Sequence, residues 1–312
     1  MSRVLPSGAD GISLCLDELL PYRRLANQIQ LTPHAASRAH QAGQHQTRSR
    51  GRGMDFEEVR QYQLGDDIRA IDWRVTARTG KPHTKLFREE RERPVNLVVD
   101  LGASMQFGSR LLLKAVQAGH LAALLAWHVA ERGDRIGAVI GNGLTLKELS
   151  AKGRQPGVLA ILHALIDMQA KAPPIDQPPA SGAFDELLRR SLKRATPGSQ
   201  LVIISDCQNW TEETPWLLAR LQRNADVSVF MITDPLELTV PKSRLPLALP
   251  IVGPAGKGLL PIGSSRFRQH YQQQRRQQII TLRQELRSQH IRFCAIGAQA
   301  GLDQQLDKVA PC

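Results

Sequence analysis

Three aspartates stand directly after short apolar runs of the sequence, where carboxylates can meet to bind a ligand. Asp100 ends the run VNLVVD, Asp206 follows the run QLVIIS, and Asp234 follows a third run. Each run has the length and continuous apolar character of a strand buried on both faces. The carboxyl ends of parallel strands meet at one edge of a sheet, and ligands of open α/β folds bind beyond that edge. We therefore expect the three carboxylates to share one edge.

The turn after the first run carries residue types that suit a hard divalent cation, because Mg²⁺ prefers several oxygen ligands. It reads DLGAS and resembles, at Asp100 and Ser104, the Asp-x-Ser-x-Ser turn of the von Willebrand factor A fold, whose oxygens hold Mg²⁺. The resemblance matches Asp206 to the acid after the fourth strand, and at best Ser181 to the usual Thr before the third helix. Gly102 stands where a hydroxyl ligand is expected. A degenerate turn without an ion is therefore favoured over an Mg²⁺ site.

The stretch from residue 53 to residue 94 has the densest charge in the chain. Acids and bases are equal in number between Asp55 and Arg93 and are interleaved, which is typical of internal ion pairing rather than of a phosphate-binding patch. Arg outnumbers Lys, which suits bidentate pairing with carboxylates. Neighbouring carboxylates on an extended segment point to opposite sides, so the Asp66-Asp67 pair is not favoured as an acid–base pair. The stretch is interpreted as a structural clasp of Asp66, Asp67, Arg69, Asp72, Trp73 and Arg78.

Within this clasp, Trp73 is expected to anchor the segment in the core through its large ring. Asp66, Asp67 and Asp72 are expected to cap turns and to pair with Arg69 and Arg78.

Strands and helices alternate along the rest of the chain. Strands are predicted at residues 95–100, 134–140, 144–149, 200–205, 226–233 and 291–296. Helices are predicted at residues 11–30 with a break at Pro21, and at 109–132, 155–170, 184–195, 212–223 and 265–289. This alternation indicates an α/β fold with a doubly wound, mostly parallel sheet, preceded by an N-terminal helical and extended charged segment. We expect the chain to divide into an N-terminal segment at residues 1–94 and the α/β domain at residues 95–312.

The chain is basic, with a formal net charge of +12. That excess favours acidic partners, and much of it comes from the helix at residues 265–289. Arg275, Arg276 and Arg283 of this helix are the candidate partner face. Because few aromatic side chains accompany them for base stacking, an acidic protein surface is favoured over nucleic acid.

The four cysteines show no metal-ligand spacing and are expected to be reduced thiols. The N-terminus lacks the pattern of a signal peptide, and no apolar run approaches the ~20 residues needed to span a bilayer. The chain is therefore predicted to be cytoplasmic.

With the charged stretch included, the chain resembles the bacterial domain-of-unknown-function 58 family over roughly residues 11–300. The motifs that carry the resemblance are Gly53, Asp55-Phe56, Arg60-x-Tyr62, Gly65-Asp66-Asp67-x-Arg69-x-Ile71-Asp72-Trp73, Thr76-Ala77-Arg78, Glu90-Arg91-Glu92, the Asp100 turn with Met105 and Lys114, Gly133-Asp134-Arg135-Ile136-Gly137, Ser205-Asp206 and Asp234-Pro235-x-Glu237. The resemblance implies a von Willebrand factor A-like core and a non-enzymatic adaptor that works with a MoxR-type AAA+ ATPase and other von Willebrand factor A-like proteins in the assembly, maturation or remodelling of complexes.

Two alternatives stay open from the residues. One is a metal-dependent hydrolase that uses the strand-end carboxylates, with Mg²⁺ as the ion. The other is a nucleic-acid binder that uses the basic helix at residues 265–289. No cofactor is implied with certainty.

Overall fold

A computed structural model describes residue 5 and residues 8–29, 54–63, 68–89, 93–174, 182–241, 248–253 and 256–309. The chain divides into two compact units, of which the first comprises Met1–Gln41 with Arg93–Cys312 and the second comprises Ala42–Glu92. The second unit ends close to the boundary expected at residue 94, whereas the N-terminal helices group with the sheet. Residues 34–53, a polar stretch between the N-terminal helices and the charged segment, lie outside the described residues.

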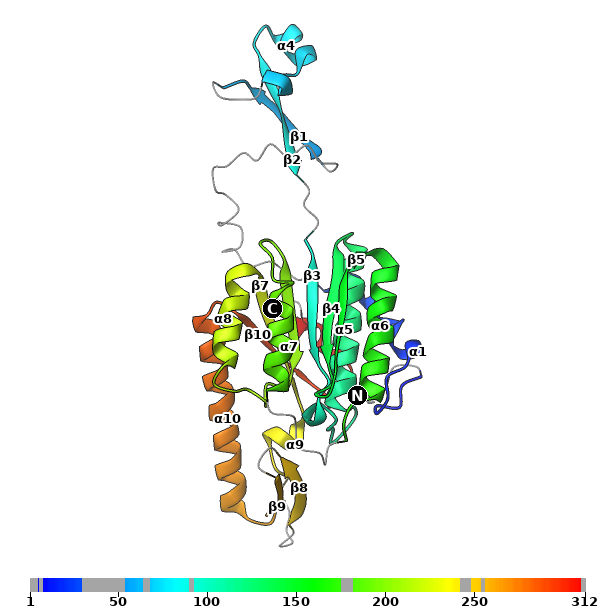
Figure 1. Ribbon diagram of the computed structural model, residues 1–312, viewed down its shortest axis with the longest axis vertical. Coiled ribbons are helices and arrows are strands. Elements are labelled where there is room, and N and C mark those ends of the chain that lie inside the picture. The colour runs from blue at the N-terminus through cyan, green and yellow to red at the C-terminus, as the bar shows by residue number, and fades with distance from the viewer. Residues whose placement is uncertain are drawn as a thin grey trace. The chain divides into compact units, whose positions relative to one another are not determined.

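The first unit is built on a six-stranded sheet in the order β10-β7-β6-β3-β4-β5 (Figure 1). All neighbouring strands are parallel except β5, which forms an antiparallel hairpin with β4 at the edge. The prediction of a doubly wound, mostly parallel α/β sheet is confirmed. The strands are β3 (Val95–Asp100), β4 (Arg135–Gly141), β5 (Leu146–Gly153), β6 (Gln200–Ser205), β7 (Asp226–Thr233) and β10 (Arg292–Gly297).

Helices cover both faces of this sheet because its central strands are apolar on both sides. In β3, Leu97 and Val99 pack into one hydrophobic cluster and Val98 into the other. The first cluster contains α5 (Lys114–Glu131) and α6 (Arg154–Ala170), and the second contains α7 (Ala183–Leu192), α8 (Thr214–Asn224) and the end of α10 (Ser265–Ser288). Strand β3 therefore reads as a continuous apolar run rather than as an alternating one.

The N-terminal segment packs on the first face. It forms α1 (Leu16–Leu19), α2 (Tyr22–Leu25) and η1 (Ala26–Gln28), with Pro21 between the two short helices as expected. Glu18 is fully buried, and its carboxylate lies 3.0 Å from Nε2 of the buried His120 in α5. A C-terminal η4 (Leu302–Gln305) and α11 (Leu306–Val309) complete the cover of this face.

An appendage leaves the sheet after β7. It consists of α9 (Pro235–Leu238), the antiparallel hairpin of β8 (Leu249–Gly253) and β9 (Gly256–Leu260), and the first turns of α10 (Figure 1). A small apolar cluster joins these parts, because Val240, Leu260 and Ile262 pack with Phe267 and Tyr271.

The second unit is an antiparallel ribbon of β1 (Met54–Gln61) and β2 (His83–Glu89), which are connected through η2 (Ile68–Ala70) and α4 (Trp73–Thr79). Trp73 is the first residue of α4, and the cap at Asp72 fixes the start of that helix through backbone hydrogen bonds. Within its own unit the residue is 68 % exposed, and the expectation that it anchors this segment in the core of the sheet stays a prediction.

Candidate functional site

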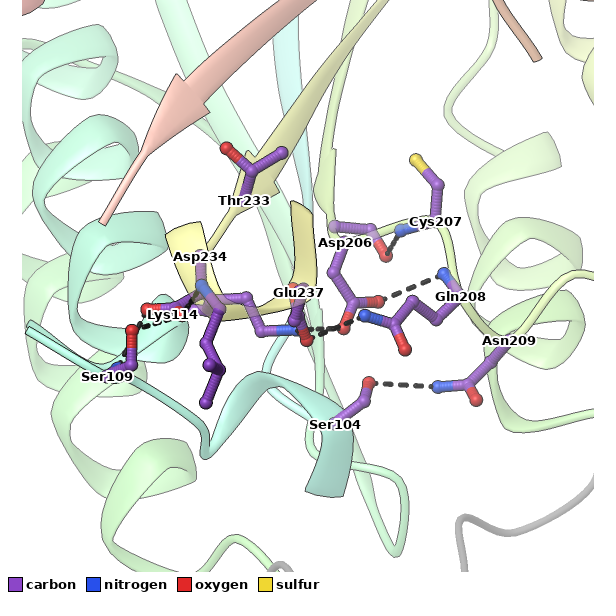
Figure 2. Close-up of polar contacts among 12 residues, drawn as sticks. Ser104, Ser109, Lys114, Asp206, Cys207, Gln208, Asn209, Thr233, Asp234 and Glu237 are labelled. Atoms are coloured by element: carbon purple, nitrogen blue, oxygen red, sulfur yellow. Dashed lines mark hydrogen bonds and ion pairs between the residues drawn. The ribbon is translucent and has the colours of Figure 1, made fainter. Parts of the chain in front are cut away.

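The candidate site lies at the carboxyl edge of the sheet, beyond β3, β6 and β7. These strands are parallel and adjacent, so Asp100, Asp206 and Asp234 stand at the same edge, as expected. All three carboxylates are buried. We refer to these aspartates, together with the groups hydrogen-bonded to them, as the carboxyl-edge site; Figure 2 shows its part around Asp206 and Asp234.

A lysine ammonium lies at the centre of the carboxyl-edge site. Lys114 is the first residue of α5, and its side chain is 0 % exposed. Its Nζ donates hydrogen bonds to Oδ2 of Asp206 at 2.7 Å and to Oε1 of Glu237 at 2.6 Å (Figure 2). Burial alone would lower the pKa of Lys114, but the two carboxylates more than offset that effect and raise it above its ordinary value. The lysine is therefore charged at neutral pH.

The site joins the sheet to the base of the appendage through Glu237 of α9. Gln208 Nε2 donates to the same carboxylate oxygen that accepts from Lys114, at 2.8 Å. The hydroxyl of Tyr271 in α10 donates to the backbone carbonyl of Glu237 at 3.1 Å. Lys114 and Gln208 thus fix α9, and Tyr271 connects α9 to α10.

Asp234 fixes two neighbouring segments of the backbone by hydrogen bonds. One of its oxygens accepts from the backbone N–H of Leu236 at 2.8 Å, which caps α9. Its carboxylate also accepts from the backbone N–H and the hydroxyl of Ser109, at 2.8 Å and 2.5 Å. This contact holds residues 109–113 in an irregular segment, so α5 begins at Lys114 and not at residue 109 as predicted.

Asp100 organises its own turn. Its Oδ1 accepts from the backbone N–H of Gly102 at 2.9 Å, and its Oδ2 accepts from the hydroxyl of Ser205 at 2.8 Å. The Ser104 hydroxyl accepts from Nδ2 of Asn209 at 3.2 Å. The turn is therefore fixed by hydrogen bonds within the chain.

The electrostatics of the edge raise the pKa values of Asp100 and Cys207. Burial, together with the negative charge of Asp206, raises the pKa of Asp100 to about 6. Burial and the charges of Asp206 and Asp100 raise the pKa of the Cys207 thiol well above its ordinary range. Cys207 is therefore a protonated thiol and a poor nucleophile.

The residues of this edge do not fit the Mg²⁺ ion of a von Willebrand factor A-type site. The Lys114 ammonium lies against Asp206, the acid that the resemblance assigns as a ligand. Gly102 offers no hydroxyl, and a Cβ at this position would lie only 3.2 Å from Oδ1 of Asp100. Within the described ranges, no cluster of three or more His, Cys, Asp and Glu side chains is arranged to hold a metal ion. We derive no chemistry through a divalent ion here.

The structure describes only some of the remaining predicted site residues, which are the ligand Ser181 and the clasp residues. Ser181, Asp66 and Asp67 lie outside the described residues. Asp72 caps α4 by accepting from the N–H groups of Arg74 and Val75, at 3.0 Å and 3.1 Å. Arg69 lies in η2 and Arg78 in the last turn of α4. Their pairing with acids stays a prediction.

The three arginines predicted as a partner face do not share one side of α10. Arg276 and Arg283 are exposed, whereas Arg275 is half-buried and its charge acts on Cys207 at the carboxyl edge. Its guanidinium donates to Oε1 of Gln278 at 3.1 Å. Arg275 therefore faces inward, and Arg287 takes its place on the exposed side.

Sequence reasoning assigned no role at the edge to Lys114 or Glu237, although both belong to the motifs quoted above. The local sequence could not have identified the lysine, because the predicted helix begins at residue 109 and places Lys114 inside it. Only the observed start of α5 puts the ammonium at the first helical residue, where it opposes the helix dipole and Asp206 and Glu237 offset that effect.

Comparison with known proteins gives a family and several structural neighbours. The family described as "Protein of unknown function DUF58" matches residues 58–280. Uncharacterized proteins of Mycobacterium tuberculosis and Mycobacterium bovis are 32 % identical over 194 residues, which cover 61 % of this chain and 58 % of each relative. The match thus spans little more than half of these relatives.

Solved structures similar to this chain include the conserved hypothetical protein BatB from Bacteroides thetaiotaomicron. It has a TM-score of 0.41 at 14 % identity and covers 70 % of this chain and 100 % of its own. An aerotolerance-related membrane protein from Bacteroides fragilis has the same TM-score and identity and covers 70 % of this chain and 98 % of its own. A von Willebrand factor type A structure from Catenulispora acidiphila has a TM-score of 0.33 at 14 % identity, covering 48 % of this chain and 35 % of its own. In the part of the chain described, no helix has both the length and the apolar character to cross a bilayer.

Proposed function

The chain belongs to the DUF58 family of proteins of unknown function, and from this premise we propose that it is a non-enzymatic adaptor of a MoxR-type AAA+ ATPase. In this role it binds the ATPase during the assembly, maturation or remodelling of other protein complexes. The resemblance to the family supports the choice of partner, because genes of the family commonly accompany such ATPases.

The observation that carries the proposal is a one-signed stripe on the exposed side of α10. Arg276, Arg283 and Arg287 are seven and four residues apart, a spacing that places them on one side of a helix, and all three are exposed. We call these three residues the arginine stripe. Ile280 lies in the same row and is 41 % exposed. Arginine beside an apolar side chain is typical of the centre of protein interfaces.

The composition of this stripe favours an acidic protein surface over nucleic acid. Single-stranded nucleic acid is bound by stacking on aromatic rings as well as by charge. The two aromatic side chains of α10, Phe267 and Tyr271, pack inward on the small apolar cluster of the appendage. The stripe can therefore supply charge and bidentate hydrogen bonds. The ring beside it, that of Phe293, lies 5.6 Å from the guanidinium of Arg283, which covers it.

The carboxyl-edge site supports a binding role in a different way. Lys114, Asp206 and Glu237 are engaged with one another, and the neighbouring Cys207 is a protonated thiol. Groups held in this way position elements of the fold instead of attacking a substrate. The carboxyl edge therefore holds α9 and α10 in place through these contacts.

The test is capture of a purified MoxR-type AAA+ ATPase from the same organism, with the purified full chain as bait. Arg276→Glu together with Arg283→Glu should weaken binding by about tenfold or more, because reversing two interface charges creates repulsion. The matched control is Arg132→Glu with Arg223→Glu, two exposed arginines outside α10, which carries the same charge change and should bind normally.

The control and the salt dependence make the outcome decisive. Binding should weaken as salt rises, because exposed charges are screened. Equal capture by both double variants, or no capture of the ATPase by the wild type, would contradict the proposal. Retention of DNA or RNA that the stripe variant alone abolishes would favour the nucleic-acid alternative instead.

A further inference from the structure

The position of Lys114 has a consequence that does not depend on the identity of any partner. We propose that its ammonium group is the resident cation of the carboxyl-edge site, and that it takes the place of a divalent metal ion in a von Willebrand factor A-type site. The protein then builds this edge without Mg²⁺ or Mn²⁺.

The first support is the geometry around the ammonium. Its Nζ lies between the carboxylates of Asp206 and Glu237, at 2.7 Å and 2.6 Å. The side chains of Lys114 and Asp206 are 0 % and 1 % exposed. An ion that used Asp206 would have to displace the ammonium or sit beside it, and two like charges repel strongly in a buried site.

The second support is the pattern of bonds beyond the lysine. A metal ion in such a site ties several loops together, and here Lys114 does so with hydrogen bonds. It connects the start of α5 to the end of β6 at Asp206 and to α9 at Glu237. Gln208 and Tyr271 extend the connection to the loop after β6 and to α10.

The third support is the position of the lysine in its helix. An ammonium at the first residue of an α-helix opposes the helix dipole, and full burial adds a desolvation cost. The two carboxylates offset both effects. The same carboxylates without the ammonium would be like charges in a buried pocket, which is the setting that favours binding of a divalent cation.

The experiment removes the ammonium and keeps the carboxylates. Lys114→Met preserves the length and apolar character of the side chain. Binding of Mn²⁺ to the purified full chain is measured by calorimetry and by the loss of the free-ion electron paramagnetic resonance signal. The wild type should bind no Mn²⁺ at about 1 mM. The variant should bind one Mn²⁺ ion with a Kd below about 1 mM.

Thermal unfolding gives an independent readout. Lys114→Met should lower Tm by about 10 °C, because it leaves buried acids without their partner. Saturating Mn²⁺ should restore most of this loss. Lys147→Met is the matched control, since Lys147 contacts Asp167 at 3.2 Å on the surface; it should change neither Tm nor Mn²⁺ binding. Adding Asp206→Asn to the Lys114 variant should abolish the acquired binding.

Two outcomes would overturn the proposal. One is stoichiometric Mn²⁺ binding by the wild type that is no weaker than binding by Lys114→Met. The other is a Lys114→Met protein with wild-type Tm and no acquired binding. If the variant does not fold without metal, it is refolded with and without about 1 mM Mn²⁺. Recovery of native circular dichroism with Mn²⁺ supports the proposal, and no recovery counts against it.

Discussion

Replacing Asp100 by Asn should remove a pH-dependent loss of stability that the wild type shows between about pH 4 and pH 6. The pKa of this carboxyl rises from its ordinary value of 3.8 to about 6 on folding, because of burial and the nearby Asp206 charge. An acid with a raised pKa binds its proton more tightly in the folded chain, so folding is penalised once the acid ionises. The penalty is absent below about pH 3.8 and complete above about pH 6.

The size of the effect follows from the shift. About two pKa units at 1.36 kcal/mol each correspond to about 3 kcal/mol of unfolding free energy. The unfolding free energy of Asp100→Asn, minus that of the wild type, should therefore rise by about 3 kcal/mol between pH 4 and pH 7. The Asn oxygen can still accept from the N–H of Gly102, so the turn keeps its main hydrogen bond.

The assay is urea unfolding followed by circular dichroism at several values of pH between 4 and 7.5. Glu212→Gln, at an exposed position, controls for the loss of one negative charge and should show no such trend. A stability difference between Asp100→Asn and the wild type that stays constant with pH, or that moves in favour of the wild type, would refute the reasoning.

Three further substitutions test the packing. Glu18→Ala removes the partner of the buried His120 and should cost about 3 kcal/mol of unfolding free energy, measured by urea titration. Gly157→Ala would place a Cβ 2.5 Å from the backbone oxygen of Lys152, so overpacking by about 1–3 kcal/mol should exceed any gain in helix propensity; an unchanged urea midpoint would contradict this. Trp73→Ser should change the thermal stability of the second unit by less than about 0.5 kcal/mol, because the residue is exposed within that unit, and a larger loss by calorimetry would contradict this.

Much of the fold could be predicted because its strands are buried on both faces. Such strands are continuous apolar runs, and β6 and β7 begin and end at the predicted residues. The shared edge of Asp100, Asp206 and Asp234 follows from parallel pairing alone. The start of α5 could not be predicted from local pattern, because the contact between Ser109 and Asp234 joins residues far apart in the sequence.

The site was less accessible to sequence reasoning than the sheet. Hydrophobic periodicity shows which side of a helix is buried, but it cannot show that a charged lysine is buried at the start of one. Lys114 depends on Asp206 and Glu237, and only the folded chain brings these three together. The burial of Trp73 was predicted from its size, and within its own unit this residue at the start of α4 is exposed.

The central claim is that the cation between Asp206 and Glu237 is the Lys114 ammonium and not a metal ion. A crystal structure of the wild-type protein grown with Mn²⁺, with an anomalous difference map, tests it in one measurement. We expect the Lys114 ammonium between the two carboxylates, with Nζ–O distances near 2.7 Å and 2.6 Å, and no anomalous peak at the carboxyl edge. An anomalous peak bound by Asp206, with the lysine turned away, would contradict the account.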